Sequence, residues 1–357
     1  MDPVLNVFSQ DAFSVLELSK AIDLVPIKWG RIGELNLFPE QGVPTTSVMV
    51  EFRNNQLYML PTRPRGAPSS VGGVGRRYAK SFNIPHIPHE DVVAAGEIQN
   101  VRGFGVPVRM ESVMDVVNRK LLTMANKHDI TLEHLRAGAL QGIIYDNDNS
   151  TVLLNLFTEF SVTAPVIFFN FAGPPTDLQM VQNCNKVKRW MEDHLMGDTF
   201  SYIHCLATPT FMDNLLANPT VLEAYKLYTN LANAAAAVNP LRDDVRRRFV
   251  WQDIVWEEYR AYAGVEAADG TSTTVNFIAD GDARFFPMGT NFTFATYFGP
   301  PTFLEGANLP GMKRYAKQAP EKFNRWIDIY TESNPLPLCL KPLCLIRGNS
   351  GAGSTNI

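Results

Sequence analysis

The densest group of potential metal ligands in the chain lies in one short stretch. It supplies two imidazoles and two carboxylates, from His86, His89, Glu90 and Asp91. Zinc accepts such ligands. Zinc hydrolases, however, place two histidines four residues apart on a helix with a glutamate between them, whereas these histidines are three apart in a segment that prolines interrupt. The pattern favours a solvated extended segment, with a metal-dependent hydrolase as the alternative.

Two further patterns are typical of ligand-binding loops but lack essential parts. Gly72, Gly73 and Gly75 could surround a phosphate, yet no lysine followed by serine or threonine comes after them. Asp146 and Asp148 have the spacing of calcium ligands, but the later glycine and glutamate of an EF-hand are missing. We expect a flexible loop and a hairpin turn, respectively.

The cysteines show no spacing that indicates a metal site or a redox pair; they are Cys184, Cys205, Cys339 and Cys344. No G-x-S-x-G motif is present either. Four cysteines in 357 residues suit a reducing compartment, so we expect buried free thiols and no disulfide. The sequence thus predicts no catalytic residue, no metal site and no cofactor, and it does not require an enzyme.

Composition places the chain among folded proteins that are not generally basic. Apolar residues make up 45% and charged residues 19%, with a formal net charge of -4, so a sizeable core is expected and any basic function must be local. The longest apolar run, 157–172, is interrupted by polar residues and proline and does not reach the roughly 20 residues of a membrane span. The N-terminus lacks the cationic start of a secretory signal. We expect cytosolic synthesis.

The elements that must position any functional residue alternate between helices and strands without a βαβ series. Spacings of three and four predict helices over 10–22, 110–128, 131–140, from Thr176 onward and over 219–236. Period-two patterns predict strands within 200–207, 249–262, 275–286 and 326–330, and a hairpin over 142–155 with its turn at 146–150. The class is α+β, and residues 348–357 are expected to be a disordered tail.

Residues 36–100 form an unusually long excursion. A hairpin is expected at 47–60, and residues 61–81 then carry five basic side chains without a carboxylate: Arg63, Arg65, Arg76, Arg77 and Lys80. A 14-residue arm reaches about 45 Å, against a radius of gyration of about 20 Å for the whole chain. Because an isolated two-stranded hairpin is marginal in water, the arm must lie on its own core or on another copy. The basic residues could contact nucleic acid or acidic patches of a neighbour.

Several long motifs carry a resemblance to a known family. They are LPTRPRGAP (60–68), KSFNIPHIPHED (80–91), GEIQNVRGFG (96–105), TLEHLRAGALQGIIYD (131–146), RRRFVWQDIVWEEYRAYAG (246–264), DGDARFFPMG (280–289), YAKQ (315–318) and ESNPLPLCLKP (332–342). In type and order they are similar to the phage major capsid protein E family, the lambda-like coat proteins. The resemblance spans nearly the whole chain.

The resemblance implies a Hong Kong 97-type capsid fold. It assigns an N-terminal arm (1–35), an extended E-loop excursion (36–100), a peripheral domain (101–173) with a spine helix (110–128), an axial domain (174–318), strands returning to the peripheral domain (319–347) and the tail (348–357). The five basic residues of the excursion would hold the E-loop against a neighbouring subunit.

The function implied is that of a major capsid protein of a tailed bacteriophage. Pentamers and hexamers of this one protein would form an icosahedral shell that encloses double-stranded DNA without sequence-specific binding. Scaffold, portal and decoration proteins are further expected partners, and assembly is expected in the host cytoplasm. The alternative from another class is a non-viral shell protein of the same fold, similar to an encapsulin.

Overall fold

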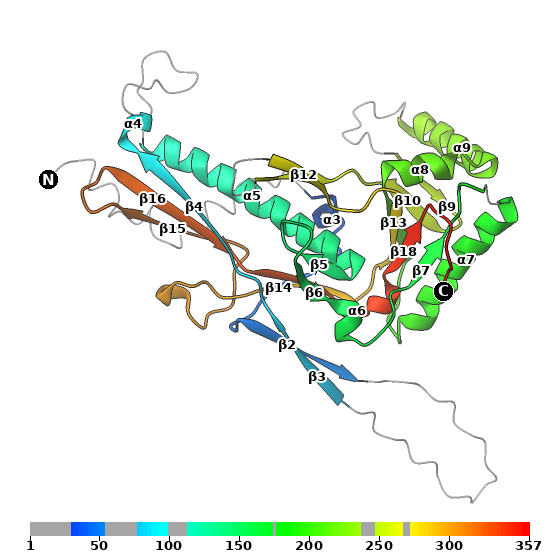
Figure 1. The fold of residues 1–357 in the computed structure, drawn as a ribbon, viewed down its shortest axis with the longest axis horizontal. Helices are drawn as coiled ribbons and strands as arrows, with labels where there is room; N and C mark the ends of the chain where they lie inside the picture. The colour runs from blue at the N-terminus through cyan, green and yellow to red at the C-terminus, as the bar shows by residue number, and fades with distance from the viewer. Residues whose placement is uncertain (1–29, 54–76, 99–112, 174–175, 237–246, 267–271) are drawn as a thin grey trace, which may run out of the picture.

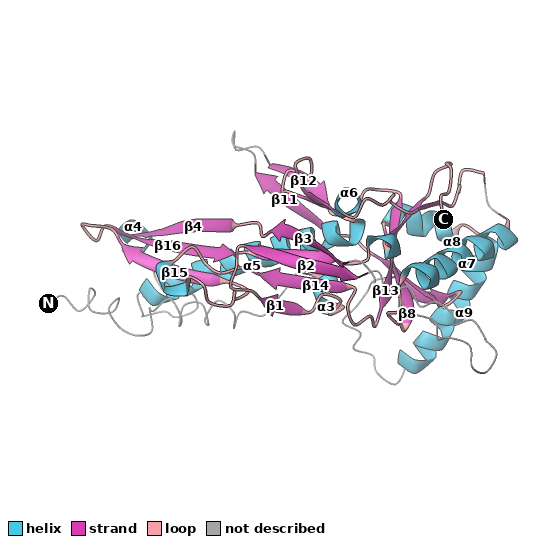
Figure 2. Cartoon of the chain, turned by 90° about the horizontal axis from the view of Figure 1, so that it is seen from below, coloured by secondary structure: helices cyan, strands magenta, loops and turns pink. Residues whose placement is uncertain are grey.

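The protein is elongated, with a sheet and a long helix toward one end and a second, larger sheet with several helices at the other (Figures 1 and 2). The computed structural model describes residues 30–53, 77–98, 113–173, 176–236, 247–266 and 272–357. Within these ranges no helix is long and apolar enough to cross a membrane. The expected α+β class is confirmed.

The long helix α5, Val113–Gln141, is continuous over 29 residues. The sequence predicted two helices, over 110–128 and 131–140, and the prediction of a break was wrong. Thr131 does not interrupt the helix, because its hydroxyl donates a hydrogen bond to the carbonyl of Lys127 one turn earlier. Buried side chains continue along the same face through both halves, including Leu121, Met124, Leu132 and Leu135. The predicted stop at Gly142 is confirmed, since its φ of 78° is left-handed and suits glycine.

One face of α5 is covered by an antiparallel three-stranded sheet. Its strand order is β15 (Tyr315–Pro320), β16 (Trp326–Ser333) and β4 (Ile87–Ala94). Val93, Ile327 and Ile329 of this sheet pack against the helix in one hydrophobic cluster. Arg314 and Asp129, both buried, form an ion pair of 3.2 Å between the sheet and α5. The other face of this sheet is covered in part by residues 302–305 and is exposed elsewhere.

A two-stranded ribbon extends from the body (Figure 1). β2 (Ser47–Arg53) pairs antiparallel with β3 (Arg77–Asn83), and neither strand pairs with any other described strand. The sequence predicted that β2 would return within 47–60, whereas its partner in the structure is β3. Residues 54–76 between the two strands lie outside the described residues.

The excursion is narrower than the sequence predicted, because much of 36–100 belongs to the body of its own chain. β4 is part of the sheet on α5. β1 (Glu40–Gly42) pairs with β14 (Phe294–Phe298), which in turn pairs with β17 (Pro335–Cys339). Val48, Val50 and Phe82 at the base of the ribbon are buried in the central hydrophobic cluster. The expectation that all of 36–100 leaves the globule is therefore wrong for these segments, whose apolar side chains complete the chain's own core.

The larger sheet has six strands. Their order is β7 (Val166–Phe168), β18 (Ile346–Asn349), β13 (Asp282–Met288), β8 (Tyr202–Ala207), β10 (Ile254–Glu258) and β9 (Arg248–Trp251). Around this sheet lie α7 (Asp177–His194), α8 (Pro209–Leu216) and α9 (Pro219–Ala236) (Figure 1). The predicted start at Thr176 is confirmed by a capping box, in which Thr176 and Gln179 exchange hydrogen bonds. Since β7 and β18 lie outside 174–318, this sheet draws on more of the chain than the expected axial interval.

Smaller elements connect these layers. The predicted hairpin is confirmed as β5 (Ile143–Tyr145) and β6 (Val152–Asn155), and α6 (Leu156–Glu159) follows it. A second hairpin, β11 (Tyr262–Glu266) and β12 (Ser272–Asn276), stands alone among the described strands. Short helical turns complete the chain: α3 (Arg31–Glu34), α4 (Ala95–Ile98), η2 (Leu304–Gly306) and η3 (Pro342–Cys344).

The C-terminal tail is ordered, contrary to the expectation of disorder. The Asn356 side chain accepts a hydrogen bond from the Val166 amide at 2.7 Å and donates one to the Ala164 carbonyl at 3.0 Å. The Thr355 hydroxyl accepts one from the Phe168 amide. The tail thus satisfies polar groups of the edge strand β7, which explains why a small polar sequence is held in place.

Candidate functional site

The ribbon β2–β3 has one buried and one exposed face near its base. Val48 and Val50 alternate inward, while Met49 between them is 69% exposed. Its cross-strand partner Ser81 and the neighbouring Ala79 are exposed on the same face. The inner face packs on the chain's own core, whereas the outer face is left exposed. The outer face of the ribbon is therefore a candidate contact surface.

The structure describes only part of the predicted basic site. Arg63, Arg65 and Arg76 lie outside the described residues. Arg77 begins β3. Lys80 is placed fully, and its ammonium lies 3.3 Å from a carboxylate oxygen of Glu159 in α6 of the same chain. Lys80 thus fixes the base of the ribbon to its own body, and contact of the five basic residues with a neighbour stays a prediction.

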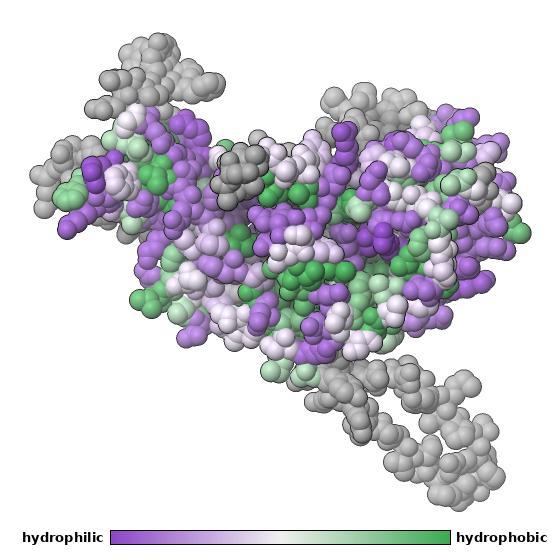
Figure 3. Space-filling model, in the orientation of Figure 1, coloured by the Kyte–Doolittle hydropathy of each residue, from purple (hydrophilic) through white to green (hydrophobic). Residues whose placement is uncertain are grey.

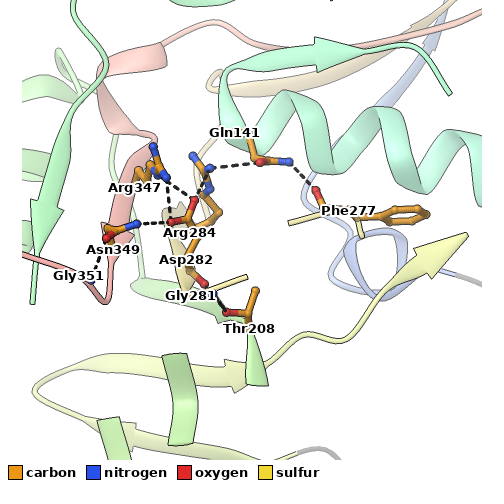
Figure 4. Close-up of polar contacts among 9 residues, drawn as sticks. All are labelled: Gln141, Thr208, Phe277, Gly281, Asp282, Arg284, Arg347, Asn349 and Gly351. Carbon is orange, nitrogen blue, oxygen red and sulfur yellow. Dashed lines mark hydrogen bonds and ion pairs between the residues drawn. The ribbon is translucent and has the colours of Figure 1, made fainter. Parts of the chain in front are cut away.

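A buried polar network joins the C-terminal end of α5 to the six-stranded sheet (Figure 4). Asp282 of β13 is its centre and accepts hydrogen bonds from Arg284, Arg347 and Asn349 at 2.7–3.1 Å. Gln141 at the end of α5 accepts one from Arg284 and donates another to the Phe277 carbonyl.

Electrostatics hold this network in one arrangement. Burial lowers the pKa of Arg284 to about 10, opposed by the charge of Asp282, so Arg284 remains a cation at neutral pH. Asp282 is 1% exposed and faces two guanidinium groups. Because a buried carboxylate needs such partners, the network fixes the position of α5 relative to the large sheet.

A second buried carboxylate fixes the start of the described chain. Glu133 of α5 accepts hydrogen bonds from the backbone amides of Ile32 and Gly33 at 2.8 and 3.2 Å, and from the Tyr259 hydroxyl. These amides belong to the first turn of α3, whose free N–H groups favour an anion. Burial nevertheless raises the pKa of Glu133, against these hydrogen bonds. Glu133 therefore holds the segment that follows residues 1–29 in a fixed place.

The histidines of the predicted ligand stretch contact other side chains of the chain. His86 contacts the Asn334 side-chain oxygen at 2.8 Å. His89 lies 3.1 Å from the Lys127 ammonium, and burial together with this charge lowers the pKa of His89. Among the described residues, no three histidine, cysteine, aspartate or glutamate side chains are placed to hold a metal ion. A hydrolase based on these residues has no geometric support in the described chain.

The other predicted ligand residues also have structural roles. The Asp148 carboxylate accepts hydrogen bonds from the amides and hydroxyls of Ser150 and Thr151, which hold its pKa below the usual range and close the β5–β6 turn. The expected core thiols are confirmed, since all four cysteines are free and buried. Burial raises the pKa of Cys184 to about 12. Such thiols are not nucleophiles at neutral pH. The glycines at 72–75 lie outside the described residues.

Exposed apolar side chains mark further surfaces. Figure 3 shows hydrophobic surface over the β5–β6 hairpin, where Val152 and Leu153 are 51% and 43% exposed. Leu304, in the short helical turn before β15, is 94% exposed. Contiguous exposed apolar surface is typical of proteins that associate.

Sequence reasoning missed the carboxylates that organise the fold, Glu133 and Asp282. Asp282 lies in the quoted motif DGDARFFPMG, where it begins a buried strand. Such an acidic residue inside an apolar strand was a usable signal, because a buried charge requires a partner. Glu133 gave no such signal, since acidic residues are common on helices.

Solved structures with this arrangement are phage proteins. A protein described as a prophage capsid protein of Escherichia coli CFT073 matches with a TM-score of 0.58 at 11% identity, covering 94% of this chain and 98% of that one. A phage-related protein from Bordetella bronchiseptica RB50 gives 0.52 at 14% identity, covering 94% and 97%. The capsid of Ralstonia phage GP4 gives 0.51 at 10% identity, covering 89% and 86%. The fold is the Hong Kong 97-type capsid fold.

Sequence relatives define the family. The model of phage major capsid protein E matches residues 14–350. The major capsid protein of Pseudomonas phage KPP10 is 26% identical over 96% of this chain and 98% of its own length, and that of Salmonella phage Felix O1 is 23% identical with the same coverage. The chain belongs to the phage major capsid protein E family and is a structural component of a phage virion.

Proposed function

We propose that copies of this chain assemble as pentamers and hexamers into the icosahedral shell of a tailed bacteriophage, which encloses double-stranded DNA. The observation that carries the proposal is the β2–β3 ribbon, which leaves the body and pairs with no other described strand. In a shell the ribbon of one subunit lies across the next, so the stability of each subunit depends on its neighbours.

The arrangement of the remaining elements supports the same function. The expected division into arm, E-loop, peripheral domain and axial domain is kept as a proposal, with α5 and the sheet on it as the peripheral part and the six-stranded sheet as the axial part. A net charge of -4 disfavours tight, non-specific DNA binding by the whole subunit. We accordingly propose that the shell encloses DNA without sequence-specific contacts. Scaffold, portal and decoration proteins complete the proposed set of partners, and assembly takes place in the host cytoplasm.

Electron microscopy of the purified full chain tests this function. Closed shells or ring-shaped capsomers are the expected result. The proposal would be contradicted by a chain that remains monomeric at high concentration, both alone and when co-expressed with the proposed scaffold, portal and decoration proteins. Enclosed enzyme without nucleic acid in shells purified from infected cells would instead favour a non-viral compartment.

The basic residues of the ribbon provide a sharper test. Charge reversal of Arg76 and Arg77 together should lower the yield of shells while leaving the subunit soluble, because these cations are proposed to pair with a neighbour. The matched control is charge reversal of Lys186 and Arg189, two exposed cations on α7. Equal shell yields for the reversal variant and the control would contradict the proposed role of the two arginines.

A further inference from the structure

The outward face of the sheet on α5 forms a small grid of cross-strand neighbours. Register places Asp328 of β16 beside Val92 of β4, and Tyr330 beside Glu90. Lys317 of β15 completes the second row. Val92 is 40% exposed, and Glu90 and Asp328 are both exposed. The face thus combines apolar surface with two carboxylates at diagonal positions, about 7–8 Å apart.

These two carboxylates have no partner within the described chain. In the described ranges, neither Glu90 nor Asp328 makes a side-chain hydrogen bond or ion pair, whereas the nearby acids do. Asp91 pairs with Lys120, and Glu332 binds the amide and hydroxyl of Thr302. The one cation on the grid, Lys317, is occupied by Glu305 at 2.9 Å. Phe303 packs on the Tyr330 ring and covers that part of the face, so the grid presents uncompensated negative charge on its exposed part, around Glu90, Val92 and Asp328.

We propose that this face receives the basic segment 61–68 of a second copy of the chain, with Arg63 and Arg65 paired to Glu90 and Asp328. This inference rests on the proposed function and names the surface that the arm of the neighbour contacts. The segment Thr62-Arg63-Pro64-Arg65 has two cations and no acid. In an extended chain, two residues two apart project from the same side and lie about 6.7 Å apart, which matches the diagonal spacing of the two carboxylates.

The composition of the segment suits the surface as well. Arginine binds carboxylates with two parallel hydrogen bonds and tolerates an apolar surrounding better than lysine does. The prolines at 64 and 68 favour an extended backbone before them and can lie on the exposed apolar positions of the grid, Pro88 and Val92.

Geometry favours a second copy over the same chain. Arg53 and Arg77 lie opposite one another at the far end of the ribbon, and β3 and β4 continue in nearly the same direction (Figures 1 and 2). Thirteen residues from Arg77 to Glu90 at about 3.3 Å each place that end about 40 Å from the grid. The ten residues from Arg53 to Arg63 span at most about 36 Å. Arg63 of the same chain would therefore fall short of the grid even with a fully extended backbone, whereas the arm of a neighbour has no such restriction.

A charge swap tests the proposal in the full chain. The face variant Glu90→Arg with Asp328→Arg and the arm variant Arg63→Glu with Arg65→Glu should each lower shell yield by about tenfold or more, because like charges then meet. The variant that carries all four changes should recover shells. Glu192→Arg with Asp193→Arg, two exposed acids on α7, is the matched control and should assemble normally. A face variant that assembles at the wild-type yield would overturn the proposal.

If the variant with all four charge changes does not recover shells, cysteine pairs test the same contact directly. Arg63→Cys combined with Glu90→Cys, or with Asp328→Cys, should form disulfide-linked multimers in oxidised shells, and the pairing with Glu192→Cys should not. The native cysteines do not compete, because all four are buried. If disulfides form only within one chain, or if neither cysteine pair forms a disulfide, the arm of a second copy does not bind to this face. If wild-type chain forms no shell at all, the proposed function fails instead, which is a separate outcome.

Discussion

Arg31 binds the buried carboxylate of Glu257 through two hydrogen bonds. Arg31 Nε lies 2.5 Å from Oε1 and Nη2 lies 2.8 Å from Oε2 of Glu257, whose side chain is 0% exposed. Burial opposes ionisation of Glu257, but the His204 ring, whose Nε2 lies 3.3 Å from Oε2, and the Arg31 guanidinium outweigh it and lower the pKa of Glu257 to about 2. The pair therefore connects α3, at the start of the described chain, to strand β10.

Loss of this pair should destabilise the subunit strongly. Arg31→Met leaves the Glu257 anion without its main partner, which should lower the free energy of unfolding by about 3 kcal/mol. Denaturant titration of the purified subunit measures it. The control is Asp253→Asn, which removes an exposed ion pair to Lys188 and should change the free energy of unfolding by less than about 1 kcal/mol. Equal effects from both variants would show that burial of the pair contributes nothing.

His128 should make the subunit sensitive to acid. Burial lowers its pKa to about 3, and the charges of His89 and Arg314 act in the same direction. The unfolded chain, with an ordinary histidine pKa of about 6.5, takes up the proton first. Stability is therefore fully present above pH 6.5 and is lost as the pH falls toward 3, by at most about 1.4 kcal/mol per pH unit from this group.

His128→Gln isolates that contribution. Glutamine is uncharged and can keep a hydrogen bond to the Thr331 hydroxyl, which His128 contacts at 3.0 Å. Urea denaturation between pH 6 and 4 should show a shallower loss of stability for the variant, by about 1 kcal/mol per pH unit. Parallel curves for the two proteins would mean that His128 is not the group that titrates.

Asp282→Asn should weaken the connection between α5 and the large sheet. The substitution keeps the shape but leaves Arg284 and Arg347 facing each other without an anion, so a loss of about 3 kcal/mol is expected. Arg347→Lys is the comparison, because Arg347 is 43% exposed and its charge is retained. It should lose about 1 kcal/mol or less. Thermal unfolding of both variants gives the ranking, and the reverse order would contradict it.

The tail should protect the edge of strand β7. Asn356→Ala removes hydrogen bonds to Val166 and Ala164, at a loss of about 1–2 kcal/mol. Amide hydrogen exchange at Val166 should become faster than in the wild type. The control is the backbone amide of Asn349, whose side chain binds Asp282. Its exchange rate should be the same in the variant and in the wild type. Unaltered exchange at Val166 would mean that the tail does not hold this edge.

Local patterns predicted single elements well. Thr176 began a helix as expected, because a capping side chain acts on its own first turn. Alternation predicted the β5–β6 hairpin and β16, in which Ile327 and Ile329 are buried and Asp328 between them is exposed.

What the sequence could not predict depends on distant partners. Helix α5 continues through Thr131 because both of its halves are buried against neighbouring sheets, and local helix propensity does not show this burial. The pairing of β2 with β3 spans the undescribed residues 54–76, and the tail is ordered only because β7 exposes an edge. The Glu90 and Asp328 pair likewise appears only when register brings two strands, far apart in the chain, side by side.

The unbroken course of α5 has a mechanical consequence. With 29 residues it is about 44 Å long, and it is fastened near one end to the three-stranded sheet and at the other to Asp282 through Gln141 and Arg284. A rigid rod of this length acts as a lever: a tilt of about 5° at one attachment displaces the other by about 4 Å. A break at Thr131 would have let each half reorient by itself, whereas the continuous rod transmits any rearrangement at one pole of the subunit to the opposite pole.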